Sequence, residues 1–295
     1  MDLEKPGIWY FTDGMTAEKA ATTAQRIEEL GYSALWIPET VGRNPFVHAS
    51  WLLANTSSLI IATGIANIYH REPGVTLAAQ NTLAEQSGNR FLLGLGVSHK
   101  PLVEGVRGLT YGKPVATMKT YLDKMAQAPY SAIKPDIHPP TVIAALGPKM
   151  LELAGTGCDG AHPYFTSPAH TKMAREIMGP KALLCVEQKV ILEENPKKAR
   201  AVARQTAKTY QSLPNYRNNW LRMGLTREDI DGEGSDSFID ATFAWGTIDD
   251  IRSRIQDHYN AGASHVCIQP VNPCLLYTSD AADEGLGVDL GGRRI

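Results

Sequence analysis

Short apolar runs alternate with segments of helical periodicity along most of the chain. Two of these runs, LIIATGIA at residues 59–66 and FLLGLGV at residues 91–97, are rich in small residues and are followed by polar ones. This pattern is typical of buried parallel strands whose carboxyl ends open onto a ligand. Eight such runs predict eight strands, at residues 7–11, 34–38, 59–66, 91–97, 142–145, 160–162, 183–192 and 265–269.

The helices expected between these strands carry recognisable start and stop residues. Asn195-Pro196 is an N-cap followed by proline, and residues 247–250 (TIDD) resemble a capping box. Gly31 and Gly262 stand where two helices should end. Alternating strands and helices predict an α/β fold, and eight strands favour a closed TIM (β/α)8 barrel over a doubly wound sheet, because no GxGxxG turn follows the first strand. The active site should then lie at the carboxyl ends of the strands.

Two segments depart from a minimal barrel. Residues 213–244 are polar and acidic, which predicts a surface excursion before the last strands, either a lid or a solvated loop without a role. Residues 274–295 contain four glycines and no helical stripe, and they resemble a translated sequencing adaptor. We therefore expect one domain over residues 1–273 and a disordered or artefactual tail, with the natural eighth helix missing and an apolar groove left between the first and seventh helices.

Composition narrows the class of ligand. The 295 residues are 43% apolar, and their net charge of −2 comes from 29 basic and 31 acidic residues without basic runs. We expect no nucleic-acid or membrane partner and a small-molecule substrate instead. The cysteines lack disulfide-like or metal-ligand spacing, so we expect free thiols and no metal site. Without a signal peptide or a membrane-spanning run, the sequence predicts a cytoplasmic protein. The cysteines are Cys158, Cys185, Cys267 and Cys274.

Small residues at two strand ends suit a flat ligand that lies against the backbone. Gly64 and Ala66 follow the third strand, and Gly94 and Gly96 lie within the fourth. We expect these positions to leave space for a ring, although small residues also serve barrel packing alone. After the fifth strand, Gly147-Pro148-Lys149 opens a helix whose amide groups and dipole would attract an anion. The same turn also opens helices that bind nothing.

Few ionisable residues stand at the predicted strand ends. His99, just past the fourth strand, is the first candidate for a proton donor or acceptor. Glu39 and His70 are further catalytic candidates, although a structural role is equally open for His70, and we expect His48 to be structural. Aromatic residues at strand ends are weaker candidates for the lining of a substrate cleft: Trp9, Tyr69, Tyr164 and Phe165.

Several segments, taken in order, resemble one known family. GIWYFTDGMT, ALWIPETVGRNPF, IIATGIANIYHREP, LAEQSGNRFLLGLGVSHK, ALGPKMLELAG and DGAHPYFTSP are similar to the luciferase-like monooxygenase superfamily, and within it to oxidoreductases that use the deazaflavin coenzyme F420. The resemblance implies a homodimeric TIM barrel that holds the ring over its strand ends, with a cis peptide at Gly64-Ile65-Ala66. It also implies that the phosphate lies after the fifth strand. The cofactor-binding residues that it implies are Gly64, Ile65, Ala66, Asn67, Gly96, Val97, Ser98, Ala145, Gly147, Pro148 and Lys149.

One position departs from the family pattern. Similar dehydrogenases carry an Asp-His pair at the end of the second strand, where this chain has Glu39-Thr40. Direct transfer of their mechanism is therefore not justified. We expect hydride transfer between coenzyme F420 and an unidentified small substrate, with His99 as the proton donor or acceptor. Two alternatives stay open: an FMN-dependent monooxygenase of the same superfamily, and a barrel that binds a flavin or deazaflavin without catalysis.

Overall fold

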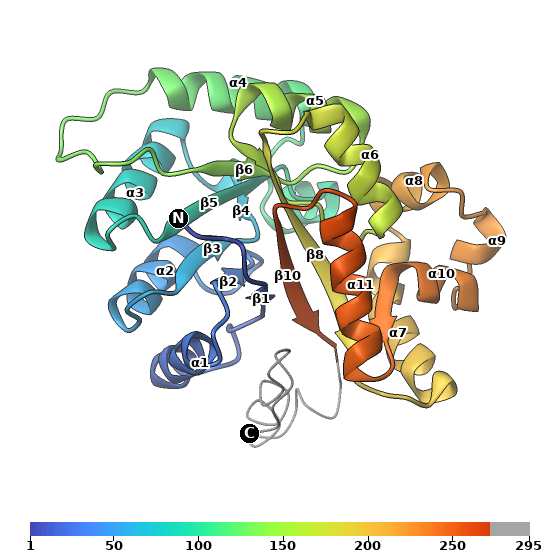
Figure 1. Ribbon diagram of the computed structural model, residues 1–295. Coiled ribbons are helices and arrows are strands. Elements are labelled where there is room, and N and C mark those ends of the chain that lie inside the picture. Colours follow the sequence, from blue (N-terminus) through green and yellow to red (C-terminus); the bar gives the residue numbers. More distant parts are fainter. Residues whose placement is uncertain (272–295) are drawn as a thin grey trace.

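The computed structural model describes residues 1–271, and its central feature is a closed barrel of parallel strands surrounded by helices (Figure 1). The sheet order is β10-β1-β2-β3-β5-β6-β7-β8, and β10 also pairs with β8, which closes the barrel. The short strand β4 pairs with β5, and β9 pairs in parallel with β8. The strands are β1 (Gly7–Trp9), β2 (Ala34–Ile37), β3 (Ile60–Thr63), β4 (Ala66–Asn67), β5 (Phe91–Gly96), β6 (Thr141–Ile143), β7 (Gly160–Ala161), β8 (Leu183–Ile191), β9 (Phe243–Trp245) and β10 (His265–Pro270).

All eight predicted strands are confirmed, and so is the TIM barrel. Their ends differ from the predicted ones by a few residues at most. The predicted third strand is interrupted at the cis peptide Gly64–Ile65, so that β3 ends at Thr63 and β4 begins at Ala66. The barrel interior is filled by alternate strand residues, among them Trp36, Ala62 and Cys185, while their neighbours face the surrounding helices.

Helices follow the strands at the positions that the start and stop residues predict. The Asn195 side chain accepts from the Lys198 amide, Thr247 forms a capping box with Asp250, and Gly31 and Gly262 follow two helix ends with positive φ. The helices are α1 (Ala17–Glu29), α2 (Pro45–Ala54), η1 (Ile68–His70), α3 (Pro73–Gln86), η2 (Pro101–Val106), α4 (Pro114–Gln127), α5 (Pro148–Gly157), α6 (Pro168–Met178), α7 (Pro196–Gln211), α8 (Pro214–Arg222), α9 (Arg227–Ile230), α10 (Asp236–Thr242) and α11 (Ile248–Asn260).

Residues 213–244 do depart from a minimal barrel before its last strands, as predicted, but they are not a solvated loop. This segment forms α8, α9, α10 and the start of β9, which lie together beside α7 (Figure 1). Four of its apolar residues, Tyr216, Trp220, Phe238 and Ile239, are buried with residues of α7 in a second hydrophobic cluster. Charged residues such as Arg217 lie between them on the outer faces of the short helices. The overall polarity of the segment therefore did not reveal its buried residues.

Other expectations have partial outcomes. The cysteines within the described residues, Cys158, Cys185 and Cys267, are free. Within residues 1–271, no helix combines the length and the apolar character needed to cross a bilayer. The predictions for the tail at residues 274–295, including the missing helix, fall outside the described residues.

Candidate functional site

The carboxyl ends of the strands bring together most of the predicted site residues. Ile65 lies between β3 and β4, and Ala66 begins β4, which pairs with β5. Ile65 is half-buried, whereas its neighbours Gly64, Ala66 and Asn67 are buried. The Trp9 indole donates a hydrogen bond to the Gly64 carbonyl over 3.0 Å. This turn is therefore fixed from inside the barrel, and the cis peptide that the resemblance implied is confirmed at Gly64–Ile65.

Protein atoms fill the space beside the glycines of β5. A Cβ atom on Gly94 would lie 1.9 Å from the Thr63 carbonyl oxygen, and one on Gly96 would lie 2.3 Å from the Ile65 side chain. We expected Gly94 and Gly96 to leave space for a ring. That expectation is wrong, because other protein atoms occupy the places where their side chains would lie. The two glycines allow β5 to approach β3 and make room for Ile65, which in turn is the residue partly open at the rim.

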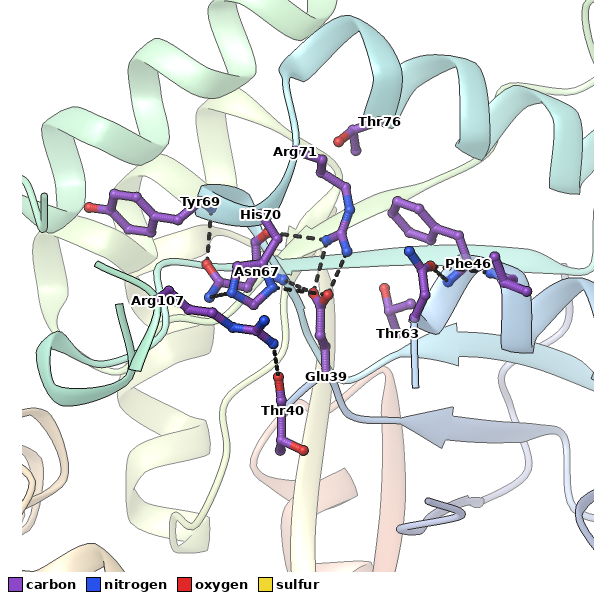
Figure 2. A network of polar contacts seen from close by, with 12 residues as sticks. Glu39, Thr40, Phe46, Thr63, Asn67, Tyr69, His70, Arg71, Thr76 and Arg107 are labelled. Atoms are coloured by element: carbon purple, nitrogen blue, oxygen red, sulfur yellow. Dashed lines mark hydrogen bonds and ion pairs between the residues drawn. The ribbon is translucent and has the colours of Figure 1, made fainter. Parts of the chain in front are cut away.

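Glu39 is the centre of a polar network at the end of β2 (Figure 2). Its Oε2 accepts from Arg71 Nη1 at 2.8 Å and its Oε1 from Arg71 Nη2 at 2.5 Å. The Asn67 amide donates to Oε2 at 2.6 Å, and His70 Nδ1 lies 3.1 Å from Oε1. The Arg71 guanidinium also packs on the Phe46 ring, 4.7 Å from its centre. Both carboxylate oxygens are thus occupied by protein donors.

The network contains two of the predicted catalytic residues, Glu39 and His70, and its hydrogen bonds restrict what they can do. Burial alone would raise the pKa of Glu39, but hydrogen bonds from Arg71 and from the Asn67 amide outweigh it, so the pKa lies below its ordinary value. The second ring nitrogen of His70 is 3.1 Å from the Asn67 side-chain nitrogen. Glu39 and His70 therefore hold the turn that carries Asn67, and this geometry supports an anchoring role over a role in proton transfer.

His99 differs from the other histidines of the chain. Its half-buried ring forms no hydrogen bond within residues 1–271 and lies 5.8 Å from the ring of Tyr216. Burial lowers its pKa, so the imidazole is neutral at neutral pH. The adjacent Ser98 has a positive φ of 55°, and its carbonyl accepts from the Tyr111 hydroxyl. Val97 packs against the main core. His99 is thus an uncharged imidazole without a hydrogen bond among the described residues, and it lies next to Tyr216 of α8.

Sequence reasoning missed a buried ion pair on β8. Lys189 and Glu187 have fully buried side chains, and Lys189 Nζ lies 3.1 Å from both Glu187 oxygens. The ammonium also lies 3.6 Å from the Tyr164 ring centre and 4.3 Å from that of Phe165. Burial lowers the pKa of Lys189 to about 8 and raises that of Glu187. The sequence VEQKV could have predicted this pair, because it places two opposite charges on one face of an otherwise apolar strand.

Aromatic residues connect this pair with the rest of the rim. The rings of Trp9 and Tyr164 are 5.1 Å apart, and Tyr164 donates to Gln269 Oε1 at 2.8 Å. Tyr216 lies 6.2 Å from Tyr164 and, on its other side, near His99. The weak expectation of aromatic residues at strand ends thus gains support for Trp9 and Tyr164.

Two other candidates lie away from these contacts. The Tyr69 hydroxyl accepts from the Gly112 amide at 2.8 Å, which holds the loop before α4. His48 is buried on α2, where its Nε2 lies 2.8 Å from Thr12 Oγ1 and burial lowers its pKa to about 4. The geometry thus supports the structural role that we expected for His48.

The start of α5 is open to a ligand. Gly147 is the N-cap residue, Pro148 is the first helical residue, and within the described residues no side-chain hydrogen bond caps the helix. A Cβ atom on Gly147 would meet, within 4 Å, only Arg222 Nη2 at 3.8 Å. Lys149 is exposed, and Ala145 is buried below. Arg222, which sequence reasoning also missed, reaches this place from the end of α8 and forms no ion pair among the described residues. Helix dipole and guanidinium together favour an anion here.

A comparison with family models supports the resemblance. The model described as luciferase-like monooxygenase matches residues 2–265. A Mycobacterium tuberculosis protein, whose name provisionally assigns it as a coenzyme F420-dependent oxidoreductase, is 30% identical over 179 residues, which cover 50% of this chain and 52% of that protein. The chain spans about half the length of the curated relatives it matches.

Solved structures show the same fold at lower identity. An F420-dependent secondary alcohol dehydrogenase in complex with an F420-acetone adduct has a TM-score of 0.75 and 16% identity, over 99% of this chain and 100% of that chain. The oxygenating constituent of 3,6-diketocamphane monooxygenase from Pseudomonas putida, in complex with FMN, has a TM-score of 0.72 and 13% identity, over 99% of this chain and 98% of that chain. At these identities the likeness shows the fold alone.

Proposed function

Because the chain belongs to the luciferase-like monooxygenase family, we propose that it is an oxidoreductase that binds coenzyme F420 at the carboxyl ends of its barrel strands. The proposed reaction is hydride transfer between this deazaflavin and a small organic substrate. The relatives whose names include F420 support the choice of cofactor. FMN is the second cofactor of the family's solved structures and is the alternative that the experiment below must separate.

The observation that carries the proposal is the uncapped start of α5. A phosphate there would accept a hydrogen bond from the Lys149 amide in the first turn of α5, and the Arg222 and Lys149 side chains would add positive charge. His170, in the first turn of α6, donates a hydrogen bond from Nε2 to the Leu146 carbonyl at 2.9 Å. Burial lowers its pKa to about 4, so it stays neutral. The residues present therefore fit the phosphate end of a flavin or deazaflavin.

Ile65 and the residues at the strand ends of β5 and β6 would hold the ring of the cofactor at the rim. When bound, the deazaflavin supplies the carbon that accepts or donates the hydride. Ile65 would support one face of the ring, and the network around Glu39 would hold the Asn67 turn in register. Trp9, bonded to the Gly64 carbonyl, would keep the same turn from receding into the barrel. These residues orient the ring and exclude water.

His99 would hold or take the proton that accompanies hydride transfer. Burial keeps its imidazole neutral, so the unprotonated ring nitrogen can accept a proton from a substrate hydroxyl, and the imidazolium formed in this way can return that proton in the reverse reaction. The Lys189–Glu187 pair would place a fixed dipole below the substrate, behind Tyr164. Tyr164 itself is bonded to Gln269 and to Tyr210, and burial raises its pKa well above the ordinary value, so it stays protonated.

Parallel titrations with coenzyme F420 and FMN test the proposal, with tryptophan quenching and cofactor fluorescence as readouts. We expect micromolar or tighter binding of F420 and at least tenfold weaker binding of FMN, a difference of about 1.4 kcal/mol. Arg222→Met should weaken binding about tenfold. Arg227→Met, an exposed change at the start of α9, is the matched control and should leave affinity unchanged. Preference for FMN would replace the proposal with an oxygen-using monooxygenase, and binding of neither would reject it.

A further inference from the structure

A cavity of about 410 Å³ lies beside the barrel, between α6, α8, α10 and α11. Its lining includes Thr166 and Ser167 at the start of α6, Asn219 on α8 and Arg254 on α11. The residues assigned above to the ring and to proton transfer do not line it. The cavity therefore needs its own explanation.

Two fully buried side chains on this lining each have a polar atom that is not hydrogen-bonded. The Asn219 side-chain nitrogen and the Thr166 hydroxyl have no hydrogen-bond partner among residues 1–271, although these residues are 0% and 1% exposed. Native proteins rarely leave buried polar atoms unsatisfied, so such atoms beside a cavity favour the binding of a polar group there. Asn219 Oδ1 already accepts from Arg222 Nη1 at 3.1 Å, which leaves the NH2 group as a donor for such a ligand.

The third feature of the cavity is the start of α6. Ser167 is the N-cap residue but its side chain makes no capping hydrogen bond, and Pro168 is the first helical residue. The first-turn amides of this eleven-residue helix therefore lack an internal acceptor, and the helix dipole places partial positive charge there. Arg254 adds a guanidinium, although it already bonds backbone carbonyls of α10 and β9, and Asp257 is the one carboxylate of the lining. Donors predominate, which suits a small anion.

The cavity adjoins the place proposed for the cofactor phosphate. Asn219, on the cavity lining, holds Arg222, whose other nitrogen lies at the start of α5. On the other side, His170 in the first turn of α6 is bonded to the Leu146 carbonyl just before α5. These two contacts place the cavity next to the start of α5, where a group that extends from a phosphate at Gly147 would begin. FMN ends at its phosphate, whereas coenzyme F420 continues from it into a lactyl and glutamyl chain that carries carboxylates.

We propose that this cavity binds a carboxylate of the glutamyl tail of coenzyme F420, through the Asn219 amide, the Thr166 hydroxyl and the first-turn amides of α6. The inference rests on the proposed function and goes further, because it assigns a site to the part of the cofactor that FMN lacks. It makes affinity depend on the tail as well as on the ring and phosphate.

The test compares the dissociation constants of glutamylated F420 and of its form without glutamates, by fluorescence titration of the full chain. The wild type should bind the glutamylated form about tenfold more tightly. Thr166→Val, which keeps the shape of the side chain, should reduce that ratio to about threefold or less and leave the affinity for the tail-less form unchanged. Asn219→Asp, which retains the acceptor for Arg222 but replaces the donor with a carboxylate oxygen, should abolish the ratio. Thr156→Val, an exposed change on α5, is the control.

The outcomes separate the two proposals. Equal affinity of the wild type for both forms, or equal weakening of both by Thr166→Val, would overturn the tail site while leaving the proposed cofactor intact. Binding of neither form would overturn both proposals. A carboxylate supplied by substrate in place of the tail would show itself as equal affinity for the two cofactor forms together with weaker substrate binding in Thr166→Val, and this result also overturns the assignment.

Discussion

Replacing Glu39 with Gln tests the network that holds the rim of the barrel. The side chains of Glu39 and Arg71 are 7% and 9% exposed, and the carboxylate accepts from Arg71 twice and from the Asn67 amide once. Gln at this position keeps one acceptor oxygen but loses the charge, which leaves the guanidinium unpaired in a buried place. Glu194→Gln, an exposed change before α7, is the matched control.

Removing one member of a buried ion pair costs about 3–5 kcal/mol of unfolding free energy, because the other charge stays buried without compensation. The acceptor that Gln retains places the expected loss at the lower end, about 3 kcal/mol. At roughly 2–4 °C per kcal/mol for domains near this size, Tm should fall by roughly 6–12 °C. The control should stay within about 0.5 kcal/mol of the wild type.

The assay is urea unfolding followed by far-UV circular dichroism, in which the midpoint should shift while the slope m stays unchanged. Arg71→Met alone and combined with Glu39→Gln completes a double-mutant cycle, whose coupling energy should exceed about 1 kcal/mol. The folded state also holds the pKa of Glu39 below 4.5, so its contribution is present above that pH and disappears as pH falls through the folded pKa. A coupling energy near zero at pH 7 would refute the anchoring role.

Three further predictions address proton transfer, the rim and acid stability. His99→Ala should leave F420 affinity unchanged and reduce turnover by about 10²–10⁴-fold, and unchanged turnover would reject its role. Gly96→Ala should displace the Ile65 side chain, since a Cβ atom there lies 2.3 Å from Ile65 Cδ1, and should weaken F420 binding about tenfold in the same titration; normal affinity would place the ring elsewhere. Burial lowers the pKa of His258 to about 3, so the folded state binds fewer protons than the unfolded state below about pH 6.5. Stability should therefore fall as pH drops from 6.5 toward 3, and His258→Gln should make the urea midpoint less dependent on pH in this range; an unchanged dependence would contradict the assignment.

The sequence was sufficient to predict the barrel because its strands are buried on both faces and therefore appear as continuous apolar runs. The helix starts at Asn195 and Thr247 were also predictable, since capping depends on residues three positions apart. The helices within residues 213–244 were not predicted, because buried aromatic residues such as Tyr216 and Trp220 are separated by polar ones and the segment was judged by its overall polarity.

The candidate site was only partly predictable for a different reason. Positions at strand ends, such as Ile65 and His99, follow from the order of elements along the chain. The Glu39–Arg71 pair and the approach of Arg222 to Gly147 join residues far apart in sequence, and only the packed structure brings them together. Lys189 was the most difficult case, because a lysine in a strand is ordinarily taken to face solvent, whereas here Glu187 and aromatic rings compensate its burial.

We expect the barrel rim to bind a deazaflavin with its ring at Ile65 and its phosphate at the start of α5. Crystals of the protein grown with coenzyme F420, alongside crystals grown with FMN, would reveal both positions. We expect electron density for the F420 ring against Ile65, with phosphate density within hydrogen-bond distance of the Lys149 amide and Arg222. Density for the ring at another place on the protein, or density in the FMN crystal alone, would contradict it.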